Sequence, residues 1–277
     1  MVSHAESCLM PPSPDTWRHE RRQIALYFGL LMLSLGLADP LGLLNLPILF
    51  LLKDTLGAGP SAVAAFQLTI LLPVYCGFMF GFLRDRWQPF GLGDRFYLLV
   101  AAPLTAVGYV WLASHRITYW TLLGVVFLIM LAFQFMDTSA QALLSSVGQR
   151  LRITGRLSAI AELLEVAPRV VAMLVGGWMV SHASSPLSFV IAAALTTVIG
   201  IQALWAPAAI FGGRQISARI EESRTALRRL LRHKPLWPTA AILLLWNFTP
   251  GWETPLFFYL SDNIGISSQA FGICKAI

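Results

Sequence analysis

The sequence has little charge and little cysteine. Charged residues make up only 12% of the 277 residues, whereas hydrophobic residues make up 56% and the mean hydropathy is +0.67. A soluble globular domain carries about 25% charged residues, so this shortage excludes a soluble fold and indicates a protein that crosses the membrane several times. The three cysteines, Cys8, Cys76 and Cys274, have no metal-type spacing, and we expect no metal site.

Catalytic and targeting motifs are also missing. The sequence contains no nucleotide-binding motif and no catalytic constellation, so we expect neither an ATP-driven pump nor an enzyme, and no cofactor. Residues 1–22 lack an apolar core and are expected to form a cytoplasmic tail instead of a cleavable signal peptide. The net charge of +6 does not indicate nucleic-acid binding, because in a membrane protein the position of each charge matters more than the sum.

The basic residues are concentrated before the first apolar run and in alternate loops. These basic segments are residues 18–22, 84–95, 150–156 and 214–234, whereas the intervening loops hold only Lys53 and Arg116. Lys and Arg collect in cytoplasmic loops. We therefore expect a multi-pass protein of the cell (inner) membrane, surrounded by lipid, with its N-terminus in the cytoplasm.

Long apolar runs predict an all-α fold, a polytopic helical bundle, because about 20 apolar residues cross the hydrocarbon core. The predicted spans are residues 24–52, 63–82, 96–113, 119–147, 157–180, 187–211 and 237–260, and an eighth helix begins at residue 269. Residues 23–211 would form a six-helix bundle, residues 212–236 a basic amphipathic linker on the anionic leaflet, and residues 237–277 the start of a second half. Because the eighth helix is too short to cross, we expect a fragment whose partner is its own missing C-terminal half.

A charged loop at residues 81–97 separates the second and third predicted spans. It reads G-F-L-R-D-R-W-Q-P-F-G-L-G-D-R-F-Y. Gly81 would let two helices approach closely, and Asp85 could accept hydrogen bonds from a helix N-terminus or pair with Arg86 or Arg95. Such a cluster could latch two halves of a bundle. The alternative is a loop that only obeys the positive-inside rule.

Two stretches of the sequence resemble known transporters. The G-x-x-x-D-R core of the charged loop resembles the loop between helices two and three of the major facilitator superfamily. The residues that carry this motif and its continuation are Gly81, Asp85, Arg86, Gly91 and Arg95. The continuation, together with the W-x-x-x-P break at residues 246–250 and the F-F-Y sequence at residues 257–259, resembles the folate-biopterin transporter family.

The resemblance implies a helical bundle of major facilitator type, present here as the N-terminal six-helix half, helix seven and the start of helix eight. It also implies secondary active transport of a small solute, such as a folate or a pterin, by alternating access. Two other functions stay open. One is a non-transporting assembly factor of the same fold, which would hold pigment or partner helices in a light-harvesting complex; the other is a sugar or drug exporter.

Several charged side chains are predicted at membrane depth, where they are costly and usually functional. They are Asp39, Asp137, Glu162, Glu165, Arg169 and Glu253, and the polar Asn247 precedes Glu253 among aromatic residues. Glu165 and Arg169 are four residues apart and should pair, with Glu162 one turn away on the same side. The alternative is that Glu162 and Glu165 lie in water at the cytoplasmic mouth and are structural.

The excess of carboxylates predicts a proton pathway, because at least one buried carboxyl group should carry a proton near neutral pH. Asp39 and Glu165 are the favoured proton carriers, which would make the protein a symporter. Arg169 would be their counter-charge or would hold an anionic group of the solute. Asp39 beside Pro40 and Glu253 between two prolines also suggest that the first helices of two related halves share a broken centre.

Overall fold

The computed structural model describes residues 14–87, 89, 92–151, 154–205, 207, 210, 236–247 and 253–276. Within these residues the protein is helical and contains no strand. The helices are α1 (Pro14–Ala38), α2 (Asn45–Phe50), the π-helix η1 (Leu51–Thr55), α3 (Pro60–Tyr75), α4 (Gly77–Arg86), α5 (Asp94–Ser114), α6 (Tyr119–Leu151), α7 (Thr154–His182), α8 (Ser185–Leu204), α11 (Leu236–Asn247), α12 (Glu253–Phe258), the π-helix η3 (Tyr259–Asn263) and α13 (Ser268–Ala276).

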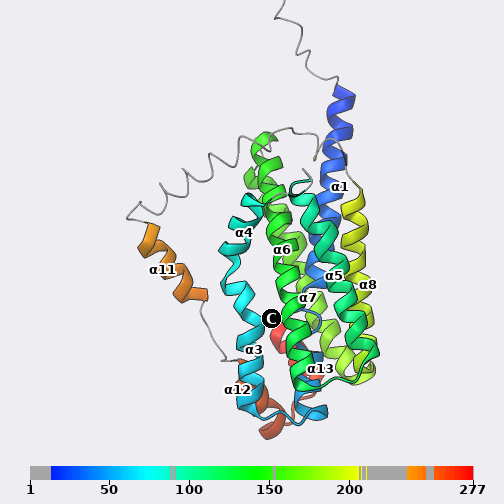
Figure 1. Cartoon of the computed structure of the whole chain (residues 1–277), viewed down its shortest axis with the longest axis vertical. Coiled ribbons are helices and arrows are strands. Elements are labelled where there is room, and N and C mark those ends of the chain that lie inside the picture. The colour runs from blue at the N-terminus through cyan, green and yellow to red at the C-terminus, as the bar shows by residue number, and fades with distance from the viewer. Residues whose placement is uncertain are drawn as a thin grey trace, which may run out of the picture.

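The long helices α1, α5, α6, α7 and α8 run side by side and form a bundle (Figure 1). Helix α5 packs between α6 and α8, and α7 packs against α1, α6 and α13. Helices α3 and α4 follow one side of α6, and α11 lies to one side of the bundle. The predicted helical membrane bundle is thereby confirmed for the part of the chain that the structure describes.

The first predicted span is broken at Asp39, as its sequence indicated. Helix α1 ends at Ala38, and the Asp39 carboxylate accepts a hydrogen bond of 2.9 Å from the backbone N–H of Leu41. The Asp39 carbonyl accepts bonds of 3.0 Å from the N–H groups of Gly42 and Leu43. Pro40 cannot donate a helical hydrogen bond. The side chain and backbone of Asp39 therefore satisfy the groups that the break leaves free.

The helices that could cross a membrane can be counted in the described part of the chain. Four helices in the described part are long and apolar enough to cross a membrane, and α3 with α4 would form a fifth. These two helices meet at Cys76 with a bend of 40°, so the second predicted span is bent between α3 and α4. The break at Asp39 divides the first predicted span into α1 and α2, and part of the seventh predicted span lies outside the described residues.

Several predicted boundaries move. Helix α1 begins at Pro14, inside the predicted tail, and α8 ends at Leu204, before the predicted residue 211. The predicted cytoplasmic loop at 149–156 is mostly helix, because α6 continues to Leu151 and α7 starts at Thr154. Residues 212–235 of the predicted basic linker lie outside the described residues.

Glycine brings α7 into close contact with two other helices. A Cβ atom on Gly36 would lie 2.4 Å from the Glu165 carbonyl oxygen, and one on Gly176 would lie 2.4 Å from the Leu43 carbonyl oxygen. On the α13 side, a Cβ on Gly177 would lie 3.2 Å from the Cα of Gly272. Only glycine permits these approaches. Gly176 and Gly177 therefore let two neighbouring segments approach the same turn of α7.

The segment from α2 to η1 is repeated as α12 to η3. Each is a six-residue α-helix followed by a five-residue π-helix, and their residue numbers differ by 208 throughout. Each is followed by a glycine with positive φ, 61° at Gly57 and 69° at Gly265. The residues identical between the two are Pro47 and Pro255, Phe50 and Phe258, Leu52 and Leu260, Asp54 and Asp262, and Gly57 and Gly265. The repeat expected of two related halves is therefore present in both sequence and structure.

The register of the repeat corrects one expectation. Asp39 does not correspond to Glu253, because a shift of 208 places Asn247 opposite Asp39 and Asn45 opposite Glu253. Both carboxylates lie near prolines in the sequence, but this similarity does not set the register of the repeat. The helix and π-helix bounds give the correct alignment.

Candidate functional site

The first candidate site is a charged cluster where α1 breaks against α7. The guanidinium group of Arg169 lies between two carboxylates, with Nε 2.7 Å from Oδ2 of Asp39 and Nη2 donating a 2.8 Å hydrogen bond to Oε1 of Glu165. The Nε–H of Arg169 makes no hydrogen bond. Its contact with Asp39 is therefore an ion pair only. Gln141 of α6 donates a 2.9 Å bond to the second oxygen of Glu165. The cluster therefore joins α1, α6 and α7.

The cluster lies between two apolar layers of the bundle. One core cluster includes α1 up to Ala38 and α7 at Ala161, and the other begins at Leu43 and includes Ala172 of α7. Asp39 is 6% exposed and Glu165 is 8% exposed, whereas the Arg169 side chain is 37% exposed. Two buried carboxylates thus share one guanidinium group, and the cluster has one negative charge in excess when both are ionised.

The structure does not gather all of the predicted acids here. Asp137 of α6 is half-buried and within electrostatic reach of Asp39, Glu165 and Arg169. Glu162 is exposed on the surface of α7 and lies within electrostatic reach of the buried Glu165. Glu165 is buried, which contradicts the alternative of a carboxylate in open water.

Glu253 belongs to a second, separate ion pair. Its Oε2 atom lies 2.7 Å from Nζ of Lys275 on α13. The Lys275 side chain is 16% exposed and that of Glu253 is 47% exposed. Lys275 was missed from the sequence, although its position in the apolar stretch F-G-I-C-K-A-I was a usable signal. Asn247 is the last residue of α11, and its side chain lies outside the described part of the protein.

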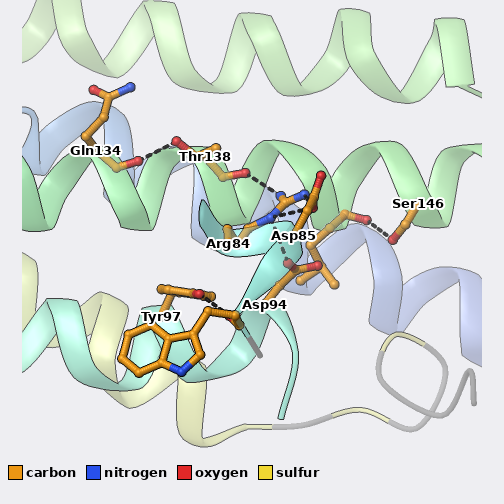
Figure 2. A network of polar contacts seen from close by, with 9 residues as sticks. Arg84, Asp85, Asp94, Tyr97, Gln134, Thr138 and Ser146 are labelled. Atoms are coloured by element: carbon orange, nitrogen blue, oxygen red, sulfur yellow. Dashed lines mark hydrogen bonds and ion pairs between the residues drawn. The ribbon is translucent and has the colours of Figure 1, made fainter. Parts of the chain in front are cut away.

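The second candidate site is the charged loop, where Arg84 is the central residue (Figure 2). Its Nη1 donates a 3.0 Å hydrogen bond to the Thr138 carbonyl of α6, and its Nε lies 3.4 Å from Oδ1 of Asp94. Its guanidinium group also pairs with the carboxylate of Asp85. Arg84 is only 8% exposed. This one side chain therefore ties the end of α4 to α6 and to the start of α5.

The predicted partners of Asp85 are wrong. Arg86 is exposed, whereas Arg84 lies one turn from Gly81 on the face of α4 that packs on α6. A Cβ on Gly81 would lie 3.6 Å from the Thr138 side chain, which shows the closeness of this contact. Helical spacing from Gly81 was the signal that could have identified Arg84.

Arg95 and Tyr97 complete the loop region. Arg95 Nε donates a 2.7 Å bond to the Ala203 carbonyl and Nη2 a 2.8 Å bond to the Leu204 carbonyl, so this side chain caps the C-terminus of α8. The Tyr97 hydroxyl donates to the Trp87 carbonyl, as Figure 2 shows. Gly91 lies outside the described residues. The loop region therefore contacts two helices, α6 through Arg84 and α8 through Arg95.

A comparison with protein families agrees with the sequence motifs. A family model described as the BT1 family matches residues 36–277. The match begins just before Asp39, so it includes the charged cluster, the loop and the pair formed by Glu253 and Lys275. No curated protein matches the sequence.

Proposed function

Because the chain belongs to the BT1 family, the folate-biopterin transporter family of the major facilitator superfamily, we propose that it moves a folate- or pterin-like solute by proton-coupled alternating access. Membership of this family makes the chain an integral multi-pass membrane protein of a transporter family. The identity of the solute, the coupling to protons and the alternation are the proposal.

The observation that carries the proposal is the cluster of Asp39, Glu165 and Arg169. Transporters bind solutes and coupling ions where helices are interrupted near the centre of the membrane. Here the interruption in α1 holds a buried carboxylate, and a second carboxylate from α7 competes for the same guanidinium group. One proton can neutralise the excess negative charge of this cluster. A proton-coupled carrier needs such a change in charge.

Protonation also has a mechanical consequence. A proton on Asp39 removes its ion pair with Arg169, and Arg169 then remains paired only with Glu165. The α1 break thereby loses its ion pair with α7, whereas the pair within α7 stays. Because Gly36 and Gly176 bring the backbones of these helices into contact just beside the cluster, a change in this pair is passed directly to the helix packing.

Alternating access needs a contact that closes each end of the pathway. At one end, Lys53 Nζ donates a 2.7 Å bond to Ser261 Oγ, pairs with Asp262 and lies 5.7 Å from the Phe257 and Phe258 ring centroids. At the opposite end of the bundle lies the Arg84 network of α4 (Figure 1). We assign the Lys53 end to the outside and the Arg84 end to the cytoplasm, following the distribution of basic residues.

Uptake into vesicles tests the proposal. Vesicles containing the whole protein should accumulate labelled folate or biopterin when the outside is acidic, and should not accumulate a sugar or an amino acid. Asp39→Asn, which cannot cycle a proton, should lose the gradient dependence. Asp54→Asn, which removes an exposed carboxylate of η1 outside the cluster, is the control and should keep it. Uptake by Asp39→Asn that still follows the gradient would refute the assignment of Asp39.

A further inference from the structure

The repeat places two polar side-chain contacts at equivalent positions. In the first copy, Gln67 Nε2 of α3 lies 3.5 Å from Oδ1 of Asn45 on α2. The same shift of 208 residues leads from Asn45 to Glu253 and from Gln67 to Lys275, whose side chains are 2.7 Å apart. The fold therefore keeps a contact between the two helices of each copy, and changes it from two neutral amides to two ions.

Stability does not account for the change to ions. The neutral pair is buried, with Asn45 and Gln67 each 8% exposed, which shows that the packing does not need charges at these positions. The Lys275 side chain is 16% exposed, so its ammonium group loses most of its hydration, and the half-exposed Glu253 offsets this cost only in part. Because the fold does not need an ion pair at these positions, we infer that the charge of Lys275 serves function instead of stability.

Lys275 lies at the depth of the charged cluster. Helix α13 is antiparallel to α7, because Gly177 faces the Ser268 carbonyl while Gly272 faces the Met173 carbonyl. One further turn of α13 leads from Gly272 to Lys275, and one turn of α7 in the same direction leads from Met173 to Arg169. Two cations, one from each copy of the repeat, therefore stand at a similar level of the bundle.

The two cations differ in how firmly they are neutralised. Arg169 is held by Asp39 and Glu165, which are both buried. Among the described residues, the ion-pair partner of Lys275 is Glu253, whose side chain is 47% exposed. A carboxylate arriving from the pathway can therefore replace Glu253 at Lys275 with less loss of buried contacts than it could replace either acid at Arg169.

We propose that Lys275 binds a carboxylate of the solute, and that Glu253 is the counter-ion which the solute displaces. This inference rests on the proposed function and specifies its substrate class. Folate carries carboxylates on its glutamate group, whereas biopterin has none. Lys275 is thus a specificity residue that favours carboxylate-bearing pteridines over uncharged ones.

The test replaces the ion pair by the neutral pair of the other copy. The double variant Glu253→Asn with Lys275→Gln recreates the side chains of Asn45 and Gln67, which the fold already accommodates. Uptake of labelled folate and of labelled biopterin is measured in the same vesicles containing the whole protein. We expect folate uptake to fall roughly 10- to 100-fold and biopterin uptake to stay within about twofold. Lys275→Arg, which keeps the charge, should retain folate uptake.

Each other outcome overturns the inference. Unchanged folate uptake would show that Lys275 does not bind the carboxylate. An equal loss of folate and biopterin uptake would show that the pair supports the structure or the transport cycle instead of recognising a charge. Wild-type protein that takes up neither pteridine would contradict the proposed function itself, and this result is obtained before any variant is compared.

Discussion

Replacing Arg169 should destabilise the protein by leaving two buried carboxylates without a counter-charge. Removing one partner of a buried ion pair costs about 3–5 kcal/mol. The Arg169 side chain is 37% exposed, so water screens part of the effect, and we expect Arg169→Met to cost about 3 kcal/mol, the lower end of that range. Glu165 keeps its bond from Gln141, so most of the cost should arise at Asp39.

The assay is the midpoint of thermal unfolding of the purified protein in detergent. A loss of this size lowers the midpoint by on the order of 5–10 °C. Arg116→Met is the matched control, because Arg116 is exposed and its replacement should leave the midpoint within about 1 °C. Adding Asp39→Asn to Arg169→Met removes the unpaired charge and should restore part of the loss. Equal midpoints for Arg169→Met and Arg116→Met would refute this reasoning.

Three further changes test other contacts. Gly36→Val should reduce the yield of folded protein or lower the unfolding midpoint sharply, because its Cβ would lie 2.4 Å from the Glu165 carbonyl oxygen. Arg84→Met should lower the midpoint by the equivalent of about 2–4 kcal/mol while the exposed neighbour variant Arg86→Met does not; equal values would contradict the network. Lys53→Met removes the ion pair with Asp262 at the outer end. A cysteine placed behind this pair in the pathway should then be labelled faster by an external thiol reagent. Unchanged labelling would show that the pair does not close the pathway.

Features set by local chemistry could be predicted from the sequence. The break at Asp39 follows from a proline that cannot donate and a carboxylate that can accept. The pair of Glu165 and Arg169 follows from helical spacing, and the close packing at Gly176 and Gly177 follows from two adjacent small side chains. In each case the determining residues are neighbours along the chain or along one helix.

Features that depend on helix packing could not be predicted. The sequence R-D-R offers two arginines beside Asp85, and only the rotation of α4 against α6 selects Arg84 over Arg86. The partner of Glu253 depends on where α13 crosses α7. The bend between α3 and α4 was not predicted either, because it falls at Cys76, within a continuous apolar run.

Proton movement driven by the solute tests the central claim most directly. Vesicles containing the protein and a luminal pH indicator start without a pH gradient, and folate or biopterin is then added outside. The account predicts that the lumen becomes acidic as the solute enters, and that vesicles with Asp39→Asn show no such change. Accumulation of the solute by the wild-type protein without any change in luminal pH would contradict proton coupling through the cluster.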